Sequence, residues 1–180
     1  MKFKTKLCAL CAVICALCAT GARADVVDFY MGGGIGAGTV YSDTVNRFST
    51  TSYAAALGID APIIRAEAEY NYIAGSRAGN SFNKNIGMLN GYVKVLPTPI
   101  IKPYIGAGVG YMFGGRISGR LNSTLRSDPA YAGMAGVQIK IPFIGIYVDV
   151  EGRVMYAPDA FPNRANMIMP EARIKLRYIF

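Results

Sequence analysis

Apolar and polar side chains alternate along most of the chain beyond residue 26, with the period of two that a β-strand produces. In "IIRAEAEYNY", residues 63–72, every second residue from Ile64 is apolar or aromatic, whereas Arg65, Glu67 and Glu69 share the opposite face. Each alternating segment is close to the ~9–11 residues of a membrane-spanning β-strand, or a little longer. We predict eight strands, at residues 27–41, 52–61, 63–74, 86–96, 102–113, 130–141, 145–157 and 167–180.

The segments between these strands are of two kinds, which alternate strictly along the chain. Three are short and contain proline: "AP", "PTPII" and "PFI". Four are longer and polar: "SDTVNRFSTT", "AGSRAGNSFNKN", "GGRISGRLNSTLRSDP" and "APDAFPNRAN". Alternating tight turns and long loops are typical of an up-and-down barrel. The predicted fold class is therefore all-β, an eight-stranded antiparallel up-and-down transmembrane β-barrel.

Alternation alone does not decide which face points inward, since a soluble barrel would bury the apolar face. The apolar face here is lean in its middle and aromatic toward its ends, as a membrane-interface girdle would be. The predicted girdle residues are Tyr41, Tyr70, Tyr72, Tyr111, Phe113, Tyr156, Tyr178 and Phe180, and the predicted lipid-facing residues include Ile105, Val109, Val148 and Ile174. The charged face carries opposite signs on neighbouring strands, as expected of side chains that must neutralise one another. We therefore predict an inverted, membrane-type barrel with an inward charge network of Arg65, Glu67, Glu69, Asp149, Glu151, Arg153, Glu171, Arg173, Lys175 and Arg177.

The signs of these charges also predict a strand register. If Glu151 faces Arg173, then Asp149 faces Lys175 and Arg153 faces Glu171, so that all three facing pairs are opposite in sign. A shift of two residues in either direction would place like charges opposite each other in a confined interior.

A glycine pattern at residues 32–37, "GGGIGA", matches the dinucleotide-binding sequence G-x-G-x-x-G/A. No helical pattern follows it, and Asp43 and Asp60 lie at unsuitable distances for the expected acidic residue. Glycine instead recurs at every second position, here and again in "YIGAGVGY", which is strand periodicity. An eight-stranded barrel has an interior just wide enough for side chains. We interpret Gly32, Gly34, Gly36, Gly38, Gly106, Gly108 and Gly110 as positions that leave room for the inward charges.

The N-terminus has the form of a secretory signal peptide. A basic segment, "MKFKTK", precedes an apolar one and the small-residue site "ARA", which predicts cleavage after Ala24. We therefore expect a signal peptide at 1–24 and a barrel domain at 25–180. Cleavage would remove all four cysteines and four basic residues, lowering the net charge from +8 to +4. No basic run suggests nucleic-acid binding.

Taken together, "FYMGGGIGAG", "IIRAEAEYNY", "KPYIGAGVGY" and "IKLRYIF" resemble the outer-membrane β-barrel domain of the opacity-type and OmpA/OmpX-like surface proteins. The resemblance implies a bacterial outer-membrane location, long loops outside the cell and both termini in the periplasm. It also implies that a terminal aromatic residue is recognised by the barrel-assembly machinery. Leu176, Tyr178 and Phe180 match that insertion signal.

Three functions are open to such a barrel: a structural or surface-interaction role with a filled interior, a weak small-solute or ion channel, and an enzyme. The chain has no histidine, so a Ser or Asp nucleophile would lack an imidazole base. We expect no catalytic activity, metal or cofactor, and favour the surface role over the channel.

The expected partners are outer-membrane lipid and lipopolysaccharide, the assembly machinery, and host surface glycans or proteins. The predicted loops carry seven arginine and lysine residues against three aspartates. Guanidinium groups suit phosphate and sulfate. The third loop, with Arg116, Arg120 and Arg126, is the candidate anion-binding loop.

Overall fold

The computed structural model describes residues 27–42, 47–77, 80–95, 98, 100–118, 123–124, 127–142, 144–158, 160 and 165–180. The predicted signal peptide lies outside these residues. The strands are β1 (Asp28–Ser42), β2 (Phe48–Asp60), β3 (Ile64–Arg77), β4 (Asn80–Lys94), β5 (Ile101–Ser118), β6 (Ser123–Thr124), β7 (Pro129–Ile141), β8 (Ile146–Ala157) and β9 (Met167–Ile179). Among the described residues, no helix is long and apolar enough to cross a membrane.

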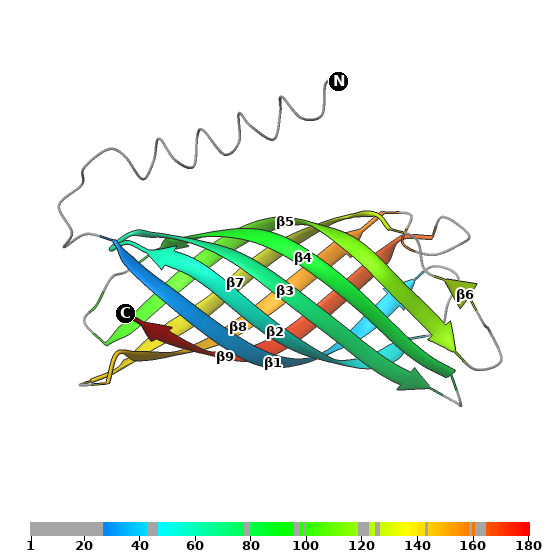
Figure 1. Cartoon of the computed structure of the whole chain (residues 1–180), viewed down its shortest axis with the longest axis horizontal. Coiled ribbons are helices and arrows are strands. Elements are labelled where there is room, and N and C mark those ends of the chain that lie inside the picture. Colours follow the sequence, from blue (N-terminus) through cyan, green and yellow to red (C-terminus); the bar gives the residue numbers. More distant parts are fainter. Residues whose placement is uncertain are drawn as a thin grey trace, which may run out of the picture.

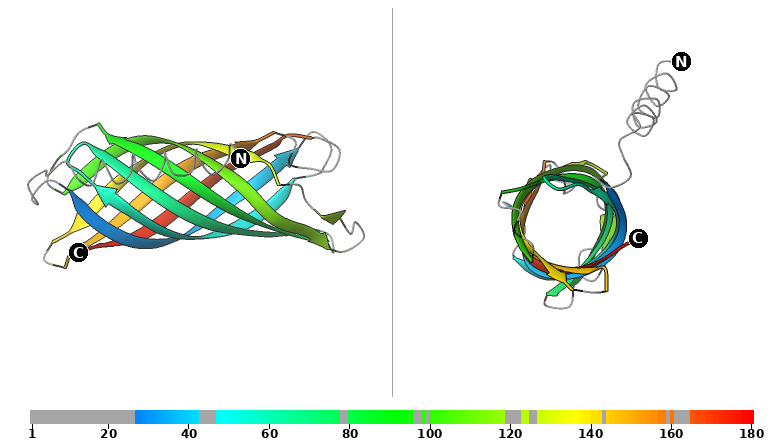
Figure 2. Two further views of the ribbon diagram at one scale, coloured as in Figure 1. Left: turned by 45° about the horizontal axis from the view of Figure 1, so that its top comes forward. Right: turned by 90° about the vertical axis from the view of Figure 1, so that its left-hand side faces the viewer.

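Eight of these strands form a closed antiparallel barrel, and the two-residue β6 adds to the edge of β5. Each long strand pairs with its neighbours in the chain, and β1 pairs with β9 to close the ring (Figure 1). Viewed along its axis, the strands form a complete circle (Figure 2). The predicted fold class is confirmed.

The strand boundaries differ from the prediction mainly at the end of the barrel that carries the long connections. The predicted loop at 75–85 was wrong for most of its length, because β3 continues to Arg77 and β4 begins at Asn80. Likewise β2 begins at Phe48 and β5 runs to Ser118. Polar Ser, Asn and Gly residues continue the backbone ladder here, since cross-strand hydrogen bonds do not require apolar side chains.

A β-bulge occurs where these extensions begin. Lys84 pairs with Gly115 and Asn85 with Phe113, so Gly114 is the additional residue on β5. Its φ of 64° lies in the left-handed region that glycine adopts without steric cost.

The two faces of the barrel are sorted as predicted. Ile105, Val109 and Ile174 are more than half exposed on the outer wall, and Val148 is partly exposed. The predicted girdle residues are all exposed: Tyr41, Tyr70, Tyr72, Tyr111, Phe113, Tyr156, Tyr178 and Phe180. The core therefore lies inside the ring of strands, and the lipid-facing wall lies outside it.

Candidate functional site: the filled barrel interior

The interior contains a network of six cationic and six carboxylate side chains, each less than a tenth exposed and each with at least one ion-pair partner within the network. We call this set the lumen network. It comprises the ten residues predicted from the sequence together with Asp60 and Lys94. The equal numbers of the two signs make the network neutral, which is the condition under which buried charge is tolerated.

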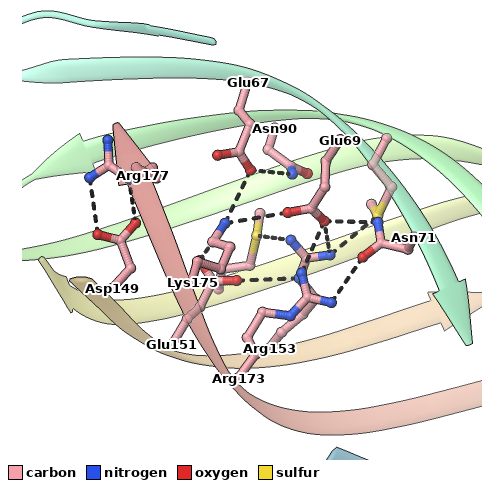
Figure 3. Close-up of polar contacts among 12 residues, drawn as sticks. Glu67, Glu69, Asn71, Asn90, Asp149, Glu151, Arg153, Arg173, Lys175 and Arg177 are labelled. Atoms are coloured by element: carbon pink, nitrogen blue, oxygen red, sulfur yellow. Dashed lines mark hydrogen bonds and ion pairs between the residues drawn. The ribbon is translucent and has the colours of Figure 1, made fainter. Parts of the chain in front are cut away.

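Two carboxylates of β3 are the centres of the network (Figure 3). Glu67 accepts hydrogen bonds from Tyr30 on β1 at 2.7 Å, from Asn90 and Tyr92 on β4 at 3.3 and 3.1 Å, and from Lys175 on β9 at 3.1 Å. One carboxylate therefore links three strands to β3.

Glu69 lies one inward position further along β3. Its Oε1 accepts from Arg153 at 2.7 Å and Arg173 at 3.0 Å, and Lys175 Nζ lies 3.3 Å from Oε2. Asn71 Nδ2 also donates to Oε1 at 2.8 Å. Four donors around one carboxylate compensate for its loss of hydration.

Toward the tight turns, Asp149 holds two arginines. Arg65 Nη1 lies 2.7 Å from Asp149 Oδ2, and Arg177 donates to both carboxylate oxygens at 2.8 and 3.0 Å. The Arg65 guanidinium lies 3.8 Å from the ring centre of Tyr92 and 4.7 Å from that of Tyr104. These arginines are thus enclosed by aromatic rings as well as by a carboxylate.

The predicted register of β8 and β9 is confirmed: Asp149 faces Lys175, Glu151 faces Arg173 and Arg153 faces Glu171. The ion pairs of these described residues nevertheless run elsewhere. Arg153 contacts Glu69 across the interior, and Arg173 contacts Glu69 and its own-strand neighbour Glu171. Long side chains reach across a barrel this narrow, so the facing residue is not the preferred partner.

Toward the loops, the interior becomes mainly apolar, although Lys84 and Thr50 are also buried there. Six of the eight methionines lie here, each no more than 5% exposed: Met88, Met112, Met134, Met155, Met167 and Met169. They pack with Val40, Ile73 and Ile86 and with several alanines. We call these methionines and their apolar neighbours the apolar layer. Unbranched thioether side chains fill an irregular space well. The lumen network and the apolar layer meet at Arg153, whose Nη2 lies 3.2 Å from Met134 Sδ.

The inward glycines provide the space that the network occupies, as the sequence indicated. A Cβ atom on Gly34 would lie 2.6 Å from Lys175 Cγ, and one on Gly32 would lie 2.8 Å from Arg177 Cγ. On Gly36 it would collide with the Glu171 carboxylate, and on Gly106 with the Tyr92 ring. These positions accommodate side chains from neighbouring strands and show no phosphate-binding turn, because β1 continues unbroken through them.

Sequence reasoning missed Asp60 and Lys94, which form an ion pair with each other. Both lie within predicted strands, at alternate positions that face inward, so the period of two is enough to identify them. Sequence reasoning also counted Lys84 among the loop cations, which was wrong, because Lys84 lies on β4 and is 1% exposed. It also missed the hydroxyl donors Tyr30, Tyr92 and Tyr104, the last of which donates to Glu151 at 3.0 Å. Hydropathy does not distinguish an inward tyrosine from one on the outer wall, so only its position in the alternating pattern shows that it faces inward.

The other predicted residues lie outside the interior. Leu176, Tyr178 and Phe180 are more than half exposed on the outer wall, and the Phe180 amide donates to Phe29 O at 3.1 Å. The backbone of Arg116 pairs with Thr124. Arg120 and Arg126 lie outside the described residues, so the candidate anion-binding loop is only partly placed.

Comparisons with known proteins agree with this architecture. The outer membrane protein beta-barrel domain family matches residues 8–166. Comparison with curated protein sequences gives no significant match. The solved Neisserial surface protein A (NspA) has a TM-score of 0.73 and 16% identity, over 84% of this chain and 97% of that one. Ail, the attachment invasion locus protein of Yersinia pestis, has a TM-score of 0.56 and 10% identity, over 84% and 98%.

A second structure of Ail, in complex with the heparin analogue sucrose octasulfate, has a TM-score of 0.52 and 11% identity, over 85% of this chain and 99% of that one. At these identities the likeness is one of fold. The family match covers most of the sequence, and the barrel has the inverted faces that a membrane requires. The chain belongs to the outer membrane protein β-barrel domain family and is a small barrel of the Gram-negative outer membrane.

Proposed function

We propose that this protein is a closed, non-conducting outer-membrane barrel whose extracellular loops carry a surface-interaction role. The observation that carries the proposal is the filling of the interior. Each of the twelve charges of the lumen network has a partner of opposite sign, so this network offers a permeating ion no unpaired charge. The apolar layer above it is the kind of constriction that excludes water and ions.

Planar-bilayer recordings of the purified, refolded protein test the closed interior. We expect no stable single-channel steps, with insertion verified by protection of the barrel from added protease. Reproducible unitary conductance from inserted wild-type protein would overturn the proposal and favour a weak ion or small-solute channel.

The partner that we propose for the loops is a phosphate- or sulfate-bearing surface, either lipopolysaccharide or a host glycan. The loop cations outnumber the loop acids, and arginine binds both groups in a bidentate manner. The complex of Ail with a heparin analogue supports this choice, because it shows a polysulfated sugar bound to a barrel of the same fold.

A pair of triple variants with equal charge loss tests the loop. R116Q/R120Q/R126Q changes the third loop, and the control R47Q/R77Q/R164Q changes the other three. We expect only the first to weaken binding to lipopolysaccharide or heparin. The difference should be smaller at high salt, since exposed charges are screened beyond about 8 Å at physiological ionic strength and over shorter distances as salt rises. Equal binding by both variants at low salt would exclude the third loop as the site.

The assembly signals complete the proposal. The N-terminal sequence of protein isolated from outer membranes is expected to begin at Asp25, after removal of residues 1–24. We propose no catalytic role, since the chain contains no histidine and the interior charges are engaged with one another.

A further inference from the structure

The three tight turns at one end of the barrel expose aliphatic side chains. Ile63 lies between β2 and β3, Val95 and Ile100 between β4 and β5, and Ile144 between β7 and β8, and each is more than half exposed. We call these four residues the turn surface. Protein turns in water are usually built from Gly, Asn, Asp and Ser, as are the long connections at the other end. The turn surface is therefore unlike a surface that faces water.

The backbone of these turns is also suited to an apolar solvent. Pro62 and Pro142 have no N–H group to satisfy. The Lys94 amide donates to Ile63 O and the Lys140 amide to Ile100 O, both at 2.8 Å. Hydrocarbon accepts a backbone only when its polar groups have partners within the protein, and these described groups have them.

Further contacts complete the same pattern. The Ala61 amide donates to Ile64 O at 2.9 Å, and the Ile179 amide to Gly145 O at 3.0 Å. The ammonium group of Lys94 points inward, where it contacts Asp60 and the Ala61 carbonyl oxygen. The charge of Lys94 is thus drawn into the barrel, whereas Lys140, beside the β7–β8 turn, and Asp28, at the start of β1, remain exposed at this end.

The height of the outer wall places the turns relative to a bilayer. The height of the wall follows from the number of residues between each turn and the girdle tyrosine at the other end of the next strand. These spans are Ile63 to Tyr72 along β3, Ile100 to Tyr111 along β5 and Ile144 to Tyr156 along β8. At ~3.3 Å per residue and a tilt of ~40°, these spans correspond to roughly 23–30 Å along the barrel axis. The apolar band of an outer-membrane barrel is ~25 Å tall. A band of this height, measured from the opposite girdle, reaches Ile63 and ends close to Ile100 and Ile144.

We propose that the turn surface lies against the acyl chains at the edge of the inner leaflet, with phospholipid as its partner. The surface is continuous with the lipid-facing wall through the neighbouring exposed residues Ile64 and Ile101. At the seam of the barrel, the rings of Tyr178 and Phe180 lie 6.2 Å apart and Phe29 is also exposed, and aromatic residues are the usual class at the membrane interface.

Single-tryptophan variants test this placement directly, because the chain contains no tryptophan. I63W, I100W and I144W are each refolded in phosphatidylcholine vesicles containing acyl-brominated lipid. The control, S76W, is at an exposed position at the other end of β3. We expect the three turn variants to be quenched strongly by the brominated chains and several-fold less by acrylamide than S76W.

Turn tryptophans that acrylamide quenches as strongly as it quenches S76W would overturn the proposal and leave the turn surface free for a periplasmic protein. A second comparison uses I63D/I100D/I144D against I63V/I100V/I144V. The aspartate variant is expected to lose folding yield several-fold as acyl-chain length increases, whereas the valine variant follows the wild type. Equal yields of both variants at every bilayer thickness would contradict this placement. Neither readout depends on channel activity or loop binding.

Discussion

At the scale of single residues, this barrel depends on buried charges that are tolerable only because each is surrounded by partners. Glu69 shows this most clearly, since two arginines, a lysine and an asparagine donate to it. Breaking a buried pair by removing one partner costs about 3–5 kcal/mol, because the remaining charge is left in a dry environment. The inward glycines contribute as well, because the absence of a side chain at these positions leaves room for the charged groups.

Replacing Glu69 with glutamine is therefore expected to lower the free energy of unfolding by about 3–5 kcal/mol, measured by urea titration of the refolded protein. Arg153, Arg173 and Lys175 would lose their shared carboxylate. Thr51→Val, on the exposed face of β2, serves as the control and is expected to leave stability nearly unchanged. Wild-type stability in E69Q would show that the network does not depend on this carboxylate.

Gly34 and Gly91 form a matched pair for the role of the inward glycines. A methyl group on Gly34 would meet Lys175 Cγ and the Ile174 carbonyl oxygen within 3 Å, whereas one on Gly91 meets nothing within 4 Å. Overpacking costs about 1–3 kcal/mol, so Gly34→Ala is expected to destabilise by that amount and Gly91→Ala is not. The same titration compares them, and equal effects would remove the steric explanation.

At the scale of elements, strand pairing is set by side chains on both faces and by local irregularities. The β8–β9 register places opposite charges face to face at three successive inward positions. A shift would bring like charges together, which explains why one register is preferred. On β4 and β5, the bulge at Gly114 separates the membrane-spanning part of the pair from its extension toward the loops.

Gly114 tests the bulge, because its φ of 64° is strained for most side chains. Gly114→Ala is expected to cost about 1–2 kcal/mol, and Gly114→Asn less, since asparagine tolerates this region better. Hydrogen exchange should show the loss at the loop end of β4 and β5. Gly133→Ala is the control, because a methyl group there meets nothing within 4 Å. A similar loss in G133A would argue against a backbone effect.

At the scale of the whole molecule, closure joins the first and last long strands, with β9 paired along β1 (Figure 1). Phe180 lies at this seam but contributes little to it, since its side chain is 67% exposed. A residue that is prominent at the seam yet contributes few internal contacts suits recognition by an assembly factor better than stabilisation of the folded barrel.

Deleting Phe180 is therefore expected to reduce outer-membrane yield in cells strongly while leaving refolding in detergent nearly unchanged. Phe29→Ala is a matched control, because Phe29 is also exposed at the same end and its carbonyl oxygen pairs with the Phe180 amide. Normal cellular yield of the truncated protein would contradict the role of the terminal aromatic residue as an insertion signal.

The sequence by itself determined the number of strands in the barrel, the alternation of inward and outward faces along the predicted strands, and the β8–β9 register. These properties depend on the period of two and on charge signs at successive positions, which are local features of the chain. It also determined why glycine recurs on β1 and β5, since an interior filled by arginine and glutamate requires empty positions on other strands.

Only the tertiary structure decided which charges pair. Arg153 reaches Glu69 across the interior and not the facing Glu171, because partner choice depends on the barrel's width and the stagger of its strands, and neither is encoded in any single strand. The same holds for the apolar layer, whose six methionines come from five strands and become neighbours only when the ring closes. It holds too for the turn surface, since the depth of Ile63 and Ile144 follows from the height of the assembled wall.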